Sequence, residues 1–181
     1  MKVTPTAIAD VLILEPKVFE DPRGFFLESY NRRAFKAATG ADPEFVQDNE
    51  SFSVRSVLRG LHYQIQQPQG KLISVIAGEI FDVAVDLRRS SRTFGKWVSA
   101  TLSGGTHRAI WIPPGFAHGF LVLSEHALVH YKASDYWAPQ HERTVIWNDP
   151  DLDIAWPLEE TPIVSDKDGR GALLKNAELF A

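Results

Sequence analysis

The chain has 181 residues, of which 44% are hydrophobic and 23% charged, and this composition is typical of one globular domain spanning residues 1–181. The net charge of −4 argues against nucleic-acid binding, which depends on clustered basic residues. Because there is no cysteine, disulfides, thiolate metal ligands and a thiol nucleophile are excluded. Without a signal-peptide pattern or a long uncharged run, we expect a cytoplasmic protein with neither a nucleic-acid nor a membrane partner.

The first predicted elements are a turn and a helix. Pro22 and Gly24 fix a turn that presents Arg23 and leads into a strand. Residues Arg32–Thr39 are expected to form a helix that ends at Gly40, because glycine accepts the left-handed conformation common after a helix. An arginine held on a tight turn suits anion binding, although an exposed turn arginine is also unremarkable.

Short apolar segments separated by turn residues dominate the rest of the chain. Leu72–Ala77 is rich in β-branched residues and Glu79–Leu87 alternates apolar with polar residues, so Gly78 between them predicts a hairpin. Many short strands with few helices favour an all-β jelly roll. Further strands are expected at Trp97–Leu102, Arg108–Ile112, His118–Leu123 and Ala127–Tyr136, and a short terminal helix at Gly171–Leu179.

Two of the six histidines stand out by their surroundings. His62 lies in one short segment with Arg59 and Lys71. A base beside two cations could hold an anionic substrate and remove a proton from it. His118 follows a rigid Pro-Pro-Gly turn at the start of a predicted strand. The remaining histidines have no such setting and are expected to be structural: His107, His126, His130 and His141.

A metal site is the first alternative for these histidines. Metal-binding cupins carry a His-x-His pair followed by Glu, and a later His after a Pro-x-Gly turn. His118 matches the later histidine, but Gln64 stands where the second histidine of the pair should follow His62. Two separated histidines without a nearby carboxylate make a poor site for a divalent cation, so we expect no metal. No other cofactor is expected.

Several other polar or aromatic residues allow two interpretations. Asp168 lies in a polar segment far along the chain, and spacing alone does not show that it meets His62. Tyr131 shares a strand face with apolar residues, which is more typical of a core tyrosine than of a catalytic acid. Trp137 at the end of that strand is either a core cap or a stacking platform. The Gln47–Asn49 triplet suits hydrogen bonds to a hydroxylated ligand or simply a loop.

Characteristic motifs cover almost the whole chain: Asp21-Pro-Arg-Gly-Phe-Phe, Phe45-Val-Gln-Asp-Asn, Val57-Leu-Arg-Gly-Leu-His-Tyr-Gln, Gly78-Glu-Ile-Phe-Asp-Val-Ala-Val-Asp-Leu-Arg, Trp111-Ile-Pro-Pro-Gly-Phe-Ala-His-Gly-Phe, Ile146-Trp-Asn-Asp-Pro and Ser165-Asp-Lys-Asp. Together these motifs resemble the deoxythymidine-diphosphate (dTDP)-4-dehydrorhamnose 3,5-epimerase family. The resemblance implies a cupin-type double-stranded β-helix, or jelly roll, with a few short peripheral helices, working as a homodimer without metal. It also implies epimerisation of dTDP-4-dehydro-6-deoxy-D-glucose at C3 and C5 to dTDP-4-dehydro-L-rhamnose, in dTDP-L-rhamnose biosynthesis.

The resemblance also implies a role for each site residue. His62 would be the general base and Asp168 would orient it. Lys71 would stabilise the enolate formed from the 4-keto sugar, and Tyr131 would return a proton to the opposite face. Trp137 stands at the position of an aromatic residue that stacks on thymine. Many relatives carry Tyr there, and Trp keeps a flat ring face for stacking. The residues implied to contact substrate are Arg23, Glu28, Gln47, Asn49, Arg59, His118, Trp137, Glu142 and Lys167.

Three other functions remain as alternatives. An epimerase that inverts only C3 or only C5 of a related nucleotide deoxysugar would share the base and the fold. A non-catalytic cupin that binds a nucleotide sugar would not need His62, Lys71, Tyr131 and Asp168 together. A metal-dependent cupin would need ligands that the segment around His62 does not supply.

Overall fold

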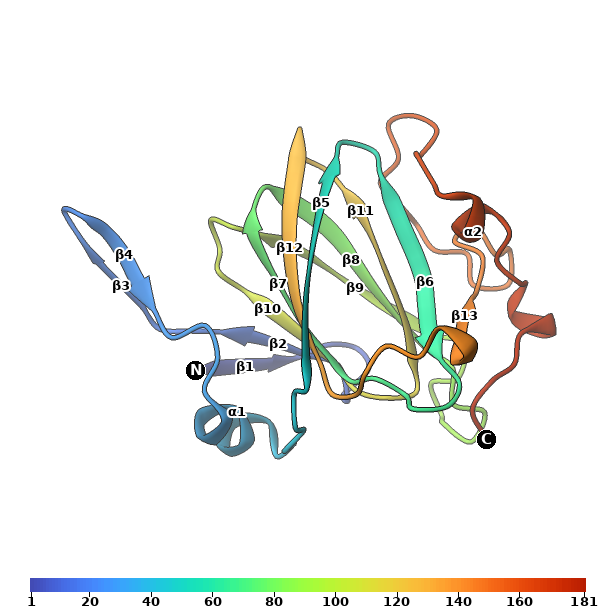
Figure 1. Ribbon diagram of the computed structural model, residues 1–181, viewed down its shortest axis with the longest axis horizontal. Helices are drawn as coiled ribbons and strands as arrows, with labels where there is room; N and C mark the ends of the chain where they lie inside the picture. Colours follow the sequence, from blue (N-terminus) through green and yellow to red (C-terminus); the bar gives the residue numbers. More distant parts are fainter.

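The computed structural model describes residues 1–181 and consists mainly of two antiparallel β-sheets packed face to face (Figure 1). This two-sheet arrangement confirms the predicted all-β jelly roll. The six-stranded sheet has the order β1 (Lys2–Pro5), β2 (Leu12–Glu15), β10 (Ala109–Ile112), β7 (Lys71–Ala77), β12 (His126–Ala133) and β5 (Gln47–Val54). The five-stranded sheet has the order β13 (Glu142–Thr144), β6 (Leu58–Gln64), β11 (Phe116–Val122), β8 (Glu79–Asp86) and β9 (Trp97–Ser103).

The remaining elements lie at the periphery. A hairpin of β3 (Val18–Asp21) and β4 (Gly24–Leu27) projects away from the two sheets (Figure 1). Helix α1 (Arg32–Thr39) has the predicted bounds, and Gly40 ends it at a φ of 75°. The other helical segments are η1 (Pro139–His141), α2 (Asp166–Gly169) and η2 (Leu174–Asn176). None of the helices has the length and apolar character needed to cross a membrane.

The hydrophobic core lies between the sheets and on the outer face of the five-stranded sheet. Ile73 and Val129 of the six-stranded sheet meet Ile80 and Phe120 of the five-stranded sheet in the inner cluster. A second cluster joins β8 to the C-terminal segment through Val83, Val85, Leu87, Leu152 and Leu174. Because the C-terminal segment packs there, it is held close to β6, which carries His62.

The hairpin predicted around Gly78 is wrong. Strand β7 pairs with β10 and β12, whereas β8 pairs with β9 and β11, so Gly78 is a crossing point between the two sheets. Its φ of 81° is left-handed, and a Cβ atom there would lie 2.0 Å from the carbonyl oxygen of His126. Alternation in the sequence sets which face of a strand is buried, but it does not set which strand pairs with it.

The helix predicted at Gly171–Leu179 is also wrong, because only the three residues of η2 are helical there. The segment is held extended by contacts with the body of the protein. Ala172 forms a bridge with Val145, and the backbone N–H of Leu174 donates to the buried carboxylate of Asp149 at 2.6 Å. These tertiary contacts override the weak local helix preference.

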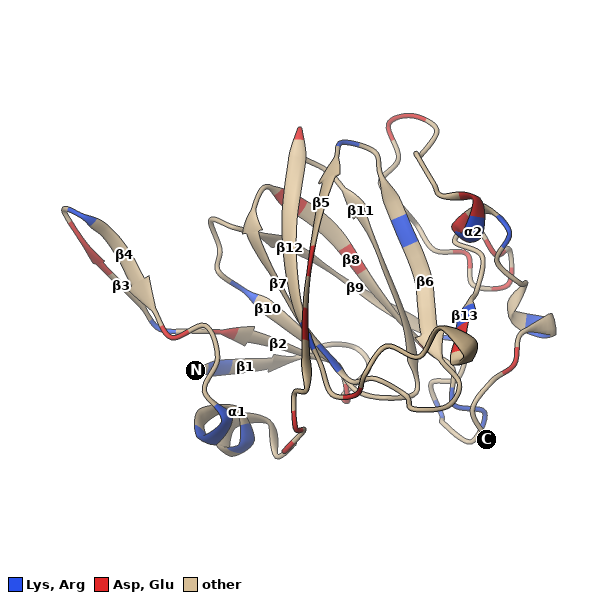
Figure 2. Ribbon diagram, in the orientation of Figure 1, with Lys and Arg blue, Asp and Glu red and all other residues tan.

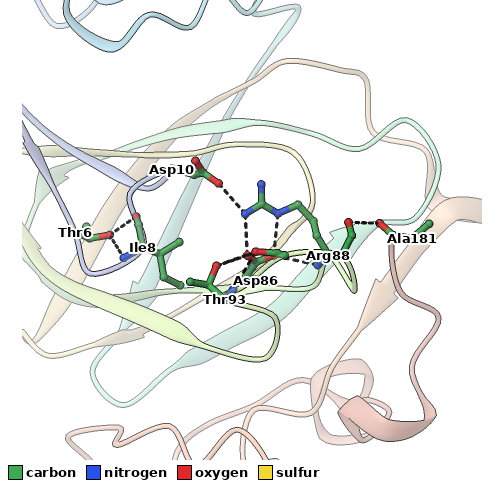
Figure 3. A network of polar contacts seen from close by, with 9 residues as sticks. Thr6, Ile8, Asp10, Asp86, Arg88, Thr93 and Ala181 are labelled. Carbon is green, nitrogen blue, oxygen red and sulfur yellow. Dashed lines mark hydrogen bonds and ion pairs between the residues drawn. The ribbon is translucent and has the colours of Figure 1, made fainter.

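The end of β8 is fixed by a polar network around Asp86 (Figure 3). The fully buried Asp86 carboxylate accepts hydrogen bonds from Arg88, Ser91 and Thr93. Burial raises the pKa of Asp86, but these hydrogen bonds outweigh it and lower the pKa to about 2. Arg88 also bonds Asp10 at 2.7 Å, so the network ties β8 to the N-terminal segment.

Candidate active site

A cavity of about 370 Å³ opens between the two sheets and collects most of the residues implied by the resemblance. Its walls come from both sheets, from the loops that follow β6 and β12, and from α2. Figure 2 shows a basic residue on β6, acidic residues on β5 and β8, and residues of both charges on α2. The lining residues are Gln47, Asn49, Arg59, His62, Gln69, Lys71, Tyr131, Trp137, Glu142 and Lys167.

His62 and Asp168 form a hydrogen-bonded pair in one wall of this cavity. His62 Nε2 lies 2.5 Å from Asp168 Oδ1, across 106 positions of sequence. Asp168 is buried on α2, and its backbone N–H donates to the side chain of Ser165, the N-cap of that helix. An ionised carboxylate accepts a hydrogen bond from Nε2–H, so this contact selects the tautomer in which Nδ1 carries the free lone pair.

The pKa values of the pair favour a neutral imidazole beside a carboxylate. Burial lowers the pKa of His62 below 6.5, although the hydrogen bond that His62 donates to Asp168 acts in the opposite direction. The positive charges of Lys167 and Lys71 lower the pKa of His62 further. Burial raises the pKa of Asp168, but hydrogen bonds from His62 and Ser165 outweigh it, so the pKa is lowered overall. His62 is therefore an unprotonated base at neutral pH.

Lys71 places a cation in the same cavity from the opposite sheet. Burial lowers the pKa of Lys71 to about 8, and the carboxylates of Glu142 and Asp82 limit the fall. Glu142 also forms an ion pair with Lys167 at 2.9 Å. Lys71 is therefore largely charged at neutral pH and close to its titration range. Such a cation can stabilise negative charge that develops on a bound ketone.

Tyr131 faces the cavity from β12 in the six-stranded sheet, whereas His62 faces it from β6 in the five-stranded sheet. Burial raises the pKa of Tyr131 above 10, so the phenol keeps its proton at neutral pH. A neutral phenol on one wall and a neutral imidazole on the other can act on opposite faces of a molecule held between them. The position of Tyr131 in the cavity wall therefore supports a role in the chemistry, in addition to its packing against the core.

Three of the implied substrate contacts do not line this cavity. Arg23 lies on the projecting hairpin, where its guanidinium pairs with Asp21 at 2.6 Å. Glu28 follows that hairpin and accepts a hydrogen bond from Asn31. His118 is on β11 beside His62, but it is buried. Within one chain, the structure therefore groups the residues of the two sheets and leaves the hairpin residues outside.

His118 belongs to a second carboxylate–histidine pair. Its Nε2 lies 2.8 Å from Oδ2 of Asp82, which is completely buried on β8. The other oxygen of Asp82, Oδ1, has no hydrogen-bond partner. Burial raises the pKa of Asp82, against the effects of His118 and Lys71. His62 and His118, the two histidines considered as metal ligands, thus pair with different carboxylates, and the chain has no group of three or more side chains placed to hold a metal ion.

The sequence interpretation missed two residues of this region. Gln69 lines the cavity, and its side chain donates to the backbone carbonyl of Asp135 at 2.8 Å. Its only sequence signal was a run of polar residues before Lys71, which is also typical of a surface loop. Asp82 had a clearer signal, because it shares a strand face with Ile80 and Ala84, both of which are in the inner core.

The predicted strand that carries Tyr131 ends earlier than expected, and this places Trp137 at the mouth of the cavity. Strand β12 ends at Ala133, and Trp137 lies in the following loop with 58% of its surface exposed. Its backbone N–H donates to the side chain of Gln47 at 2.9 Å. An exposed indole at the rim is a suitable surface for stacking against a planar ring.

Comparisons with known proteins identify the family of this chain. The sequence model of the dTDP-4-dehydrorhamnose 3,5-epimerase family matches residues 5–176. The chain is 59% identical over 180 residues to the dTDP-4-dehydrorhamnose 3,5-epimerase of Pseudomonas aeruginosa, and the match covers 99% of each chain.

Two solved structures are similar to the whole chain. The dTDP-6-deoxy-D-glucose-3,5-epimerase of Legionella pneumophila in complex with dTDP-4-keto-L-rhamnose is 50% identical, with a TM-score of 0.96 over 98% of this chain and 94% of that one. A 3′-monoepimerase of Streptomyces bikiniensis in complex with dTDP-quinovose is 35% identical, with a TM-score of 0.89 over 97% of this chain and 88% of that one. The chain therefore belongs to the dTDP-4-dehydrorhamnose 3,5-epimerase family.

Proposed function

We propose that this protein epimerises dTDP-4-dehydro-6-deoxy-D-glucose at C3 and C5 to give dTDP-4-dehydro-L-rhamnose. The observation that carries the proposal is a base, a cation and an acid around one cavity, with the base and the acid on opposite sheets. The 59% identity to a 3,5-epimerase, against 35% to a 3′-monoepimerase, favours double over single epimerisation.

His62 begins the reaction as the general base. The hydrogens on C3 and C5 are acidic because the ketone at C4 accepts the electron pair that each C–H bond leaves behind. Nδ1 of His62 takes the proton, and the Asp168 carboxylate stabilises the imidazolium that forms. The nearby ammonium of Lys71 stabilises the enolate oxygen at C4.

Tyr131 completes the inversion at each carbon. If His62 alone returned the proton, the original configuration would be restored. Tyr131 instead donates its phenolic proton from the other wall, so the new C–H bond forms on the opposite face of the ring. The phenolate then recovers a proton from solvent, and His62 releases the one it took. The same pair of groups acts at C3 and C5 in two successive steps.

The nucleotide is held by groups around the mouth of the cavity. The ring of Trp137 would stack on thymine. Arg59 and Lys167 supply positive charge for the diphosphate, and a guanidinium suits bidentate contacts with phosphate oxygens. The amides of Gln47 and Asn49 and the carboxylate of Glu142 offer hydrogen bonds to the nucleoside or the sugar.

We also propose that the enzyme works as a homodimer. The hairpin exposes Phe25 and Phe26, and the six-stranded sheet exposes Phe52, Val54 and Ile76 on its outer face. These apolar surfaces fit contact with a second copy of the chain. Such a contact would also explain how Arg23 and Glu28, which lie outside the cavity of their own chain, reach substrate in the partner's cavity.

Two further assignments are part of the proposal. Residues 1–181 would form one catalytic domain, which is supported by a family match over residues 5–176. The cytoplasm, without a nucleic-acid or membrane partner, remains the compartment predicted from the sequence.

His62→Ala is expected to reduce turnover by at least about a hundredfold, because positioned acid–base groups typically contribute ~10²–10⁴-fold to the rate. The measurement is the formation of product from dTDP-4-dehydro-6-deoxy-D-glucose, with folding checked by circular dichroism. His141→Ala is the matched control and is expected to keep wild-type turnover. A His62→Ala enzyme with more than about a hundredth of wild-type activity would rule out His62 as the base.

Tyr131→Phe is expected to separate proton removal from inversion. The base is intact in this variant, so C3 and C5 should still exchange hydrogen with deuterated water, while formation of the L-sugar falls by about a hundredfold or more. NMR of the recovered nucleotide sugar measures both quantities. Equal losses of exchange and inversion would contradict the assignment of Tyr131 as the acid.

The plot of kcat/KM against pH is expected to be bell-shaped. The acidic limb should lie below 6.5, because the pKa of His62 is lowered and the base is lost only as pH falls through it. The alkaline limb should lie at about 8, where rising pH removes the proton of Lys71. Lys71→Arg should move the alkaline limb above 10, where Tyr131 loses its proton, because guanidinium stays charged. An alkaline limb unchanged in Lys71→Arg would assign it to another group.

Mixing two variants tests the dimer. Arg23→Ala should bind substrate weakly and His62→Ala should be inactive, but a mixed dimer has one cavity with His62 and with Arg23 from the partner. Activity at low substrate concentration should therefore rise when His62→Ala protein is added in excess to Arg23→Ala and the subunits exchange. No rise, despite mixed dimers detected by native mass spectrometry, would show that Arg23 does not act across the interface.

A further inference from the structure

The buried amide of Gln64 holds the backbone on both sides of Trp137. Gln64 is 4% exposed, and its Nε2 donates to the backbone carbonyls of Tyr136 at 3.2 Å and Gln67 at 2.7 Å. Its Oε1 accepts from the backbone N–H of Ala138 at 2.8 Å. Both amide hydrogens and one lone pair of the oxygen are thus committed to backbone groups, and two of the three bonds flank Trp137.

A second glutamine holds Trp137 itself from the opposite sheet. Gln47, on β5, accepts the backbone N–H of Trp137 through Oε1 and donates through Nε2 to Asn49 at 2.8 Å. Three consecutive backbone groups, the carbonyl of Tyr136 and the N–H groups of Trp137 and Ala138, are therefore bound by side-chain amides. The ring of Trp137 projects from a fixed backbone even though it is largely exposed.

Gln64 also connects this loop to the catalytic base. It lies two positions after His62 on β6, so the two side chains project from the same face of the strand. Its neighbour across the pair of strands is Glu142, which lines the cavity. One side chain thus fixes the loop of Trp137 relative to the strand that carries His62.

We propose that Gln64 is a positioning residue, which holds Trp137 where it stacks on the nucleotide while the sugar lies against His62. This inference rests on the proposed function and assigns to it a residue that contacts neither the substrate nor the reacting atoms. A ring on a fixed backbone loses little conformational freedom when the nucleotide binds, so the glutamine raises affinity without touching the ligand. Replacing Gln64 should therefore change the affinity for the nucleotide and KM, and leave the rate of the chemical step largely unchanged.

The test measures binding of thymidine diphosphate by calorimetry to the wild-type protein, Gln64→Leu, Trp137→Ala and the double variant. Gln64→Leu keeps approximate volume and removes all three bonds, and we expect an increase in Kd of about tenfold with kcat changed by less than about threefold. Because Gln64 acts through Trp137, Gln64→Leu should add less than about a twofold loss in the Trp137→Ala background. Gln66→Leu changes an exposed glutamine in the loop that follows β6, so it is the matched control and should bind as the wild type does.

A second variant covers the case in which Gln64→Leu does not fold. Gln64→Glu keeps an acceptor for the N–H of Ala138 but places a carboxylate against two carbonyl oxygens. As the pH falls, the carboxyl group becomes protonated and can donate a hydrogen bond to one of them. Relative to the wild type at the same pH, this variant should therefore bind thymidine diphosphate more tightly as the pH falls. The inference would be overturned if the two substitutions raised Kd independently in the double variant, or if kcat fell while Kd stayed unchanged. The unfolding of both variants would also overturn it. Wild-type protein that binds thymidine diphosphate without epimerising the sugar would overturn the proposed function alone, and wild-type protein that fails to bind it would overturn both.

Discussion

The site depends on one contact between distant parts of the chain, the hydrogen bond from His62 to Asp168. Strand β6 supplies the imidazole, and α2 supplies the carboxylate more than a hundred positions later. The contact forms because the C-terminal segment packs on the outer face of the five-stranded sheet through residues such as Leu152 and Leu174. Apolar burial far from the cavity therefore sets the tautomer of the base, and a change in that packing would reach the chemistry through Asp168.

The crossing at Gly78 has an equally direct consequence for the chemistry. Because β7 and β8 belong to different sheets, the polar residues of the two sheets face each other across one cavity. Lys71 and Tyr131 come from one sheet, and His62 comes from the other. An ordinary hairpin at Gly78 would have placed neighbouring strands side by side in one sheet. The jelly-roll topology thus supplies the two opposed walls that inversion at a carbon atom requires.

The sequence predicted some features from local patterns and others only through resemblance. Helix α1 was predicted correctly because its cap at Gly40 is a local signal, whereas the hairpin at Gly78 and the terminal helix depend on tertiary contacts that periodicity does not encode. The spacing of residues along the sequence did not predict that Asp168 contacts His62, and only the family resemblance suggested that contact. Gln64 was noted merely as a missing metal ligand, since its hydrogen bonds go to backbone groups that no sequence motif identifies.

The most direct test of the account is an incubation of the wild-type protein with dTDP-4-dehydro-6-deoxy-D-glucose in deuterated water, followed by NMR. We expect deuterium at both C3 and C5 of the sugar, together with the configuration of dTDP-4-dehydro-L-rhamnose in the product. Deuterium at one carbon only would contradict double epimerisation and indicate a single epimerase. No deuterium at either carbon would contradict the assignment of His62 as a base that removes protons from the sugar.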